Sequence, residues 1–283
     1  MAVSTVRLVR LPGLRLAVDD GGSSPPGAPP FLLVHGWLGS HRTWAHLAPR
    51  WREQRRVLAV DLRGHGASSA PPSGYALPDL AGDLAALLDA EGLRGAVVVA
   101  HSLGCSVTSR LAVQRPDLVA GMVLVDPDYG GDPGARDRLA AVAAIPDDDV
   151  LRAAVAELFD RIDADTASPA LRAAHRADAA RVPAHAVRGT LAGLVGGLPS
   201  PRFRPEAEIV LARRTQPVLA LHRRPEQASW ERGLVTHPDS EVRVCPGAGH
   251  WIHEERPARV AAAVDRWLRR AVPSPSPSQE VSS

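Results

Sequence analysis

The chain has 283 residues, 45% of them hydrophobic and 23% charged, which is typical of a globular protein long enough to bury a large core. Its formal net charge is only +2, which argues against a nucleic acid or an anionic membrane as its partner. All 33 residues counted as Lys or Arg are Arg. Chemistry that needs a Lys amine, such as Schiff-base formation, is therefore excluded.

The two cysteines, Cys105 and Cys245, lie far apart, and the sequence shows no CxxC motif and no zinc-ligand spacing. The N-terminal residues lack a signal-peptide pattern, and no apolar run approaches the ~20 residues that a membrane span needs. We expect a cytoplasmic protein that acts on a small molecule, without bound metal or cofactor. Nothing in the sequence indicates the oligomeric state.

The first part of the chain predicts a β-hairpin, because the apolar runs Val6–Val9 and Leu14–Val18 are separated by Pro12-Gly13. Six further apolar runs each end at a polar residue or a turn: Phe31–Val34, Val57–Val60, Ala96–Ala100, Met122–Val125, Val218–Leu221 and Val242–Val244. Since these runs lack polar alternation, they are typical of strands buried on both faces of a parallel sheet.

Helices are predicted between these strands, where apolar residues recur at spacings of three and four: Thr43–Gln54, Leu80–Glu91, Leu103–Gln114 and Pro257–Arg270. The alternation of strand and helix predicts an α/β fold with a doubly wound, mostly parallel, eight-stranded sheet.

One stretch breaks this alternation and divides the chain. Residues 127–206 are Ala-rich and helical in pattern, which predicts a helical cap inserted after the sixth strand. The core would then comprise residues 1–126 and 207–272. The Pro- and Ser-rich residues 273–283 are predicted to form a disordered tail.

Ser102 is the strongest candidate for a nucleophile. It stands between an apolar strand and a helix, in Ala100-His-Ser-Leu-Gly104, with small residues two positions away on each side. A nucleophile at a strained strand-to-helix turn needs small neighbours, and the usual pattern is G-x-S-x-G, here with Ala100 as the first residue. The competing interpretation is a Ser that only caps the following helix.

Two main-chain N–H groups are expected to stabilise an oxyanion. That of Leu103 lies at the start of the helix after Ser102, where free N–H groups and the positive end of the helix dipole favour negative charge. That of Trp37 follows a buried strand and the pair His35-Gly36. Alternatively, the second segment is an ordinary turn in which His35 is hydrogen-bonded in the core.

His250 is the candidate general base. It lies in Pro246-Gly-Ala-Gly-His-Trp251, after the last predicted strand. From there an imidazole can reach across the carboxyl edge of the sheet, where ligands bind in open α/β folds. A solvated loop His is the alternative.

Taken together, these segments resemble the α/β-hydrolase superfamily. The matching pieces are His35-Gly36-Trp37, Asp61-Leu-Arg-Gly-His-Gly66, Ala100-His-Ser-Leu-Gly104 and Gly247-Ala-Gly-His250. The resemblance covers nearly the whole chain apart from the cap and the tail. It implies a nucleophile, an acid and a His in that chain order.

The acid of the implied triad is less plainly marked. Many members of the superfamily carry it after the strand that here ends at His222, but the following turn offers only Glu226. Some families place it after the preceding strand, where this sequence has Asp126. We therefore expect Asp126 to orient His250, with Glu226 as the alternative.

The resemblance implies a serine hydrolase that cleaves an ester, thioester or lactone of a small to medium, partly apolar substrate. Residues next to the catalytic loops are expected to contact that substrate: His35, Gly36, His41, Tyr129 and Trp251. A haloalkane dehalogenase or an epoxide hydrolase is disfavoured, because the nucleophile position holds Ser rather than Asp.

Two alternative functions remain. The stretch from His35 to His41 is also similar to the H-G-W-x-x-x-H segment of cofactor-free dioxygenases that cleave hydroxyquinolones, which likewise place the acid at the Asp126 position. In such an enzyme His250 and Asp126 would deprotonate the substrate and Ser102 would position it. A binding protein that kept the fold and lost activity is the other alternative.

Overall fold

The computed structural model describes residues 4–131, 133–163, 167–196 and 199–272. The predicted disordered tail, 273–283, lies outside the described residues. None of the described helices is both long enough and apolar enough to cross a membrane.

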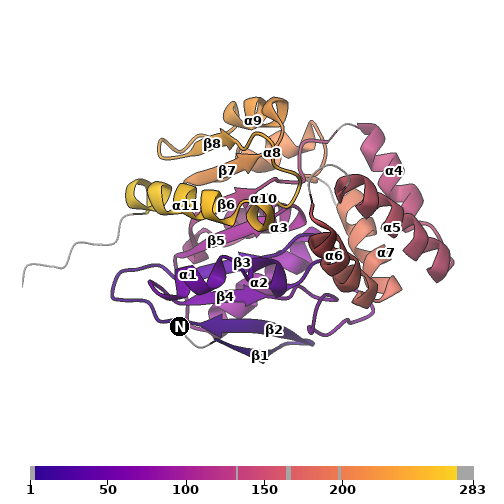
Figure 1. Cartoon of the computed structure of the whole chain (residues 1–283), viewed down its shortest axis with the longest axis horizontal. Helices are drawn as coiled ribbons and strands as arrows, with labels where there is room; N and C mark the ends of the chain where they lie inside the picture. The colour runs from indigo at the N-terminus through magenta and orange to yellow at the C-terminus, as the bar shows by residue number, and fades with distance from the viewer. Residues whose placement is uncertain (1–3, 132, 164–166, 197–198, 273–283) are drawn as a thin grey trace, which may run out of the picture.

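The described strands form one eight-stranded sheet in the order β1-β2-β4-β3-β5-β6-β7-β8 (Figure 1). Their bounds are β1 Ser4–Leu11, β2 Leu14–Gly21, β3 Phe31–Val34, β4 Val57–Val60, β5 Ala96–His101, β6 Val119–Val125, β7 Val218–His222 and β8 Glu241–Val244. β1 and β2 form the predicted hairpin, and β2 also pairs antiparallel with β4. All other neighbours are parallel, so the predicted mostly parallel sheet is confirmed.

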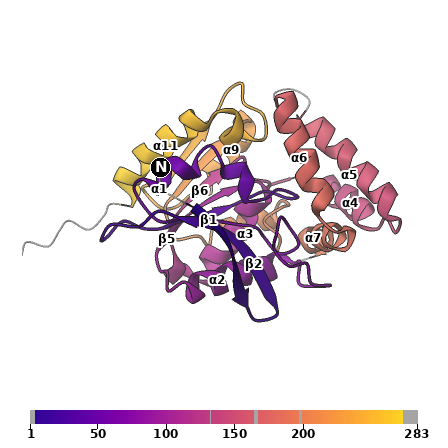
Figure 2. The ribbon, with the colours of Figure 1, turned by 60° about the horizontal axis from the view of Figure 1, so that its bottom comes forward.

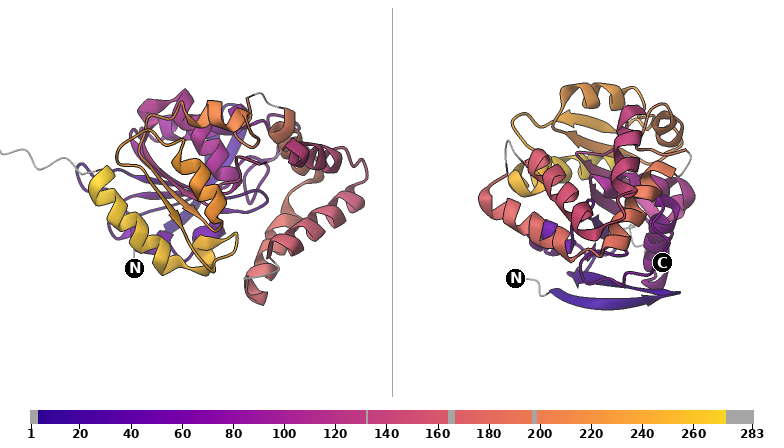
Figure 3. Two further views of the ribbon diagram at one scale, coloured as in Figure 1. Left: turned by 90° about the horizontal axis from the view of Figure 1, so that it is seen from above. Right: turned by 90° about the vertical axis from the view of Figure 1, so that its right-hand side faces the viewer.

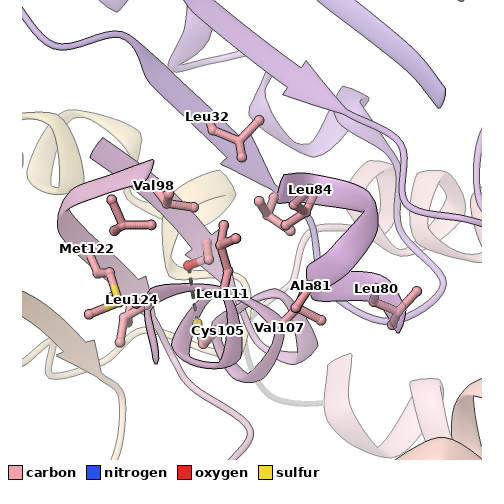
Figure 4. Packing of buried hydrophobic residues seen from close by; sticks show 14 of the residues in the cluster. Leu32, Leu80, Ala81, Leu84, Val98, Cys105, Val107, Leu111, Met122 and Leu124 are labelled. Carbon is pink, nitrogen blue, oxygen red and sulfur yellow. Dashed lines mark hydrogen bonds between the residues drawn. The ribbon is translucent and has the colours of Figure 1, made fainter. Parts of the chain in front are cut away.

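Both faces of the sheet are covered, which explains the unbroken apolar strands. Successive side chains of a strand point to opposite faces: Leu32 of β3 belongs to the cluster under α2 (Leu77–Ala90) and α3 (Leu103–Gln114), and its neighbour Leu33 belongs to the cluster under α1 (Ala48–Arg52) and α11 (Pro257–Ala271). Figure 4 shows the first cluster, where Leu84 and Leu111 reach from the two helices toward Val98. A polar side chain on either face would be buried without a partner, which is costly.

One predicted helix, Thr43–Gln54, is wrong in its extent. The segment instead forms a short 3₁₀ turn, η1 (His41–Trp44), and then α1 (Ala48–Arg52). Pro49 explains the interruption, because it has no N–H to donate and its ring would clash with the carbonyl one turn earlier. A proline is accepted only in the first turn of a helix, which is where α1 places it.

Four helices follow β6 within the range predicted for the cap: α4 (Pro133–Ala143), α5 (Asp148–Asp163), α6 (Pro169–Arg181) and α7 (Ala184–Gly196). They gather together beside one end of the sheet (Figures 1, 2 and 3). They have an apolar cluster of their own, in which Phe159 of α5 and Leu191 of α7 meet Tyr75 and Trp251 of the core. This cluster fixes the four helices over the carboxyl ends of the strands.

Three remaining short helices lie between strands: η2 (Pro116–Leu118), α8 (Glu206–Leu211) and α9 (Pro225–Arg232). The fourth, α10 (Ile252–Glu255), lies between β8 and α11.

Candidate active site

Two of the candidate catalytic residues lie at strained turns that leave neighbouring parallel strands. Ser102 follows β5 and precedes α3 with φ 48° and ψ −118°, and Asp126 follows β6 with φ 39°. L-residues rarely adopt positive φ, and such strain persists only where the surroundings hold it. Here the N–H of Ser102 donates to the carbonyl oxygen of Val125 (3.1 Å), which ties the two turns together.

The turn at Ser102 is packed so closely that neighbouring positions admit no side chain. A Cβ at Gly36 would lie 2.7 Å from Nδ1 of His101, and one at Gly104 would lie 2.7 Å from the carbonyl oxygens of both Val34 and His35. The predicted need for small residues around this Ser therefore has a steric cause: α3 begins directly against the end of β3.

This packing predicts that replacing two helical glycines, Gly104 and Gly82, will change the free energy of unfolding in opposite directions. Gly104→Ala is expected to lower the free energy of unfolding by about 1–3 kcal/mol, because the new methyl group meets backbone atoms that cannot move away. Gly82→Ala is the matched control: Gly82 is exposed in α2 with no atom within 4 Å of a new Cβ. It should stabilise the protein by about 0.5–1 kcal/mol. Urea unfolding measures both, and equal effects would contradict the packing argument.

The side chains of Ser102, His250 and Asp126 form one hydrogen-bonded chain. Nδ1 of His250 lies 2.7 Å from Oδ2 of Asp126, and Nε2 lies 3.0 Å from Oγ of Ser102. An ionised carboxylate only accepts, so Nδ1–H donates to Asp126. Nε2 is then left as the acceptor for the Ser102 hydroxyl proton, which is the tautomer a general base needs.

Asp126 is held ionised by its surroundings. Burial alone would raise its pKa, but the hydrogen bonds from His250 and from the main chain of Arg223, with the charge of Arg223, lower the pKa below its ordinary value of 3.8. The main-chain N–H of Arg223 donates to Oδ1 (3.1 Å), and Nε of the same residue lies 3.0 Å from Oδ2. The carboxylate is therefore fixed in position as well as in charge.

Glu226, the alternative acid, lies elsewhere. It is in the first turn of α9, its side chain is 69% exposed, and its carboxylate is 3.9 Å from Nε of Arg224. In the described structure, the carboxylate that is hydrogen-bonded to His250 belongs to Asp126.

The two expected oxyanion donors are free in the described part of the chain. Leu103 is the first residue of α3, so its N–H has no partner within the helix, and Trp37 lies beside Ser102 on the wall of a cavity. Neither main-chain N–H donates to another described residue. Both groups are thus available to a ligand at Ser102.

Two of the predicted substrate contacts, His35 and His41, need correction, because neither is among the described residues that line this cavity. His35 is fully buried, and its Nε2 accepts from the N–H of Leu62 (3.0 Å); burial lowers its pKa. Nδ1–H of His41 donates to Asp61 (2.9 Å), a hydrogen bond that raises the pKa of His41. Both imidazoles are therefore engaged in hydrogen bonds that hold loops together.

The other three predicted contacts divide between two places. Gly36 and Trp251 border a separate small void of about 10 Å³, and Trp251 stacks on His175 (4.1 Å between ring centres) while its ring meets His250 edge-on. Tyr129 does line the main cavity, but its hydroxyl donates to the buried Glu231. Tyr129 can therefore offer a ligand only its ring.

The cavity at Ser102 has a volume of about 700 Å³ and lies between the strand ends and the cap helices. Ser102, Asp126 and His250 are part of its wall, and apolar cap residues such as Leu158 and Leu191 form another part. Within the described ranges, no three His, Cys, Asp or Glu side chains are grouped to hold a metal ion.

The cavity wall also contains residues that the sequence patterns do not predict. Five of them are arginines: Arg138, Arg202, Arg204, Arg223 and Arg224. The last two directly follow β7, at the edge of the sheet where ligands bind, and that position is a signal in the sequence. The other three have no such signal, because only the packing of the cap region brings them to the site.

Comparison with known proteins places the chain in a family. Residues 31–263 match the model of the alpha/beta hydrolase family, which covers well over half of the chain. Among curated relatives, 2-(acetamidomethylene)succinate hydrolase of Mesorhizobium japonicum is 29% identical, with 93% of this chain and 94% of that protein aligned. Epoxide hydrolase A of Mycobacterium tuberculosis is 27% identical over 95% of this chain and 98% of its own length.

A similar solved structure is that of a thermophilic esterase from Thermogutta terrifontis, with a TM-score of 0.77 and 24% identity over 96% of this chain and 99% of that one. At this identity the likeness concerns the fold, and it agrees with the sheet and helices described above. The family model and the shared architecture lead to one conclusion: this chain belongs to the alpha/beta hydrolase family of enzymes.

Proposed function

We propose that this protein is a serine hydrolase that cleaves a carboxylic ester, thioester or lactone. The observation that carries the proposal is the ring of His250, which bridges the hydroxyl of Ser102 and the carboxylate of Asp126 at the wall of a large cavity. This arrangement supplies a nucleophile, a general base and an orienting acid in one chain of hydrogen bonds.

The reaction begins when Oγ of Ser102 attacks the substrate carbonyl carbon while Nε2 of His250 takes the hydroxyl proton. The carbonyl oxygen becomes an oxyanion, which the N–H groups of Trp37 and Leu103 stabilise. When the carbon–oxygen or carbon–sulfur bond breaks, the leaving group takes the proton from Nε2. This step leaves an acyl group on Ser102.

Water then completes the turnover. His250 removes a proton from a water molecule that attacks the acyl carbonyl, and the same proton returns to Oγ of Ser102 as the acid product leaves. Asp126 stabilises the imidazolium in both half-reactions without itself taking the proton. We further propose that residues 127–206 act as a cap that limits substrate size, on a core of residues 1–126 and 207–272.

The similarity to cofactor-free dioxygenases gives a weaker alternative. It depended on the stretch from His35 to His41 and on the acid at the Asp126 position. Neither imidazole of that stretch lines the cavity. Trp37 is the member of that stretch on the cavity wall. The ester reaction gives a role to each group that meets at Ser102: the nucleophile, the base, the acid and the N–H groups of Trp37 and Leu103.

One pair of assays separates the two reactions. The protein is expected to release p-nitrophenol from short-chain p-nitrophenyl esters at a rate proportional to enzyme concentration, without added cofactor. It is expected to consume no oxygen when mixed with a hydroxyquinolone. Oxygen uptake without ester turnover, in a folded sample, would overturn the proposal in favour of the oxygenase.

A further inference from the structure

The cavity at Ser102 has two chemically different walls. One is apolar and comes from the cap helices, with Leu158 and Ile162 on α5 and Leu191 and Leu194 on α7. The other carries the five arginines and comes from α4, the segment before α8 and the turn after β7. A neutral, wholly apolar substrate would leave the second wall without a complementary partner.

Carboxylates are fewer than arginines on the described cavity wall. Two acidic residues line the cavity, Asp126 and Asp128. Asp126 is already shared between His250 and Arg223, and Asp128 lies 3.9 Å from Nε of Arg202. The described lining therefore holds more guanidinium groups than carboxylates, which favours an anionic ligand.

One guanidinium group of this wall, that of Arg204, is positioned by partners that carry no charge. Arg204 lies 4.3 Å above the ring of Trp230 and donates to the side-chain oxygen of Gln227 (3.3 Å). Arg202 donates to the main-chain oxygen of Asp128, whose carboxylate lies 3.9 Å from Nε of Arg202, and it lies beside the ring of Phe203. These contacts orient both cations, and those of Arg204 leave its charge available to a ligand.

We propose, on the basis of the serine hydrolase function above, that the natural substrate carries a carboxylate at a distance from its reacting carbonyl. Arg204 binds this carboxylate, together with Arg202 beside it. The apolar part of the substrate packs against Leu158 and Leu191. Guanidinium groups suit this role, because their planar N–H donors match the two oxygens of a carboxylate.

A matched pair of esters tests this specificity. Mono-4-nitrophenyl glutarate has a free carboxylate, and methyl 4-nitrophenyl glutarate has the same chain with that charge removed. The wild-type protein is expected to show kcat/KM at least about tenfold higher for the anionic ester in low salt. The preference should shrink as NaCl rises toward about 0.5 M, because salt screens charges on an open wall.

The arginines themselves are tested by substitution. Arg204→Gln and Arg202→Gln are each expected to reduce the ratio of the two kcat/KM values by about tenfold, whereas Arg269→Gln should leave the ratio unchanged. Arg269 is exposed in the last turn of α11, away from the cap helices (Figure 1). Thermal melts of the three variants check that each is folded, and having two different cavity variants keeps the test valid if one is unstable.

A binding measurement distinguishes failure of this inference from failure of the proposed function. Glutaramate carries the same carboxylate and an amide in place of the ester, so calorimetric titration with it measures binding without ester turnover. Binding that is lost in Arg204→Gln, in a protein that hydrolyses neither ester, would retain the anion site and overturn the hydrolase proposal. Hydrolysis of both esters at equal rates, without such binding, would overturn the anion site and retain the hydrolase.

Discussion

Replacing Ser102 with Ala is expected to lower kcat for p-nitrophenyl ester hydrolysis by at least about 10,000-fold, because the acyl-enzyme can no longer form. The residual rate would come from the cavity and the N–H groups of Trp37 and Leu103, which bind the ester and polarise it without a nucleophile. The measurement is initial rate at saturating ester, with active-site concentration fixed by absorbance of pure protein.

Ser73→Ala provides the control for this substitution. Ser73 is exposed in the loop after β4, outside the residues that line the cavity, so the variant should keep its full rate. The thermal melts of both variants should resemble that of the wild type. A Ser102→Ala protein that keeps a tenth or more of its rate would show that another group attacks the ester.

Asp126→Asn is expected to lower kcat by about 10,000-fold while Glu226→Gln stays within about twofold of the wild type. The new side-chain amide can donate to Nδ1 of His250, which moves the ring proton to Nε2. In that tautomer Nε2 can no longer accept the proton of Ser102, although the two atoms remain 3.0 Å apart. Glu226 is exposed on α9, so its amide should have no effect on the imidazole.

The two variants are well matched. Each substitution removes one negative charge, at a residue that follows β6 in one variant and the neighbouring strand β7 in the other. A steep loss for Glu226→Gln with an active Asp126→Asn enzyme would mean that α9 rearranges in solution and supplies the acid. Steady-state kinetics at a single pH suffices, since the two expected rates differ by several orders of magnitude.

The arrangement of the sheet could be predicted from sequence because burial on both faces leaves a strong pattern. Runs such as Phe31–Val34 and Val57–Val60 are apolar at every position, and the structure gives them these same bounds. The helix predicted at Thr43–Gln54 failed because periodicity is insensitive to a single Pro. Apolar spacing continues through Pro49, whereas a helix can only begin there.

The candidate site could be predicted only in part, because the sequence shows where a strand ends but not which way the next side chain points. Ser102 and Asp126 each follow directly on a buried strand, so their meeting at one edge follows from the parallel sheet. His35 and His41 also follow a strand, yet hydrogen bonds to Leu62 and Asp61 turn their rings away from the cavity. Whether a polar side chain near a strand end faces substrate or its own loop depends on partners far along the chain.

The arginines show what lies beyond sequence patterns. Arg202 and Arg204 are separated from Ser102 by about a hundred residues of chain, and the cap helices lie between them in sequence. Their approach to the cavity depends on how the segment before α8, which contains Phe203, packs against Trp230. No local motif encodes such packing. The net charge of the whole chain is only +2, so it gives no sign that arginines gather on one wall of the cavity.

The nucleophilic role of Ser102 is the central claim, and covalent labelling with mapping of the adduct tests it most directly. After reaction with a fluorophosphonate, intact-mass spectrometry should show one added group per chain. Peptide mapping should place that group on the hydroxyl of Ser102, and Asp126→Asn should slow the labelling. An unlabelled protein that still hydrolyses esters, or an adduct on any other residue, would contradict this role.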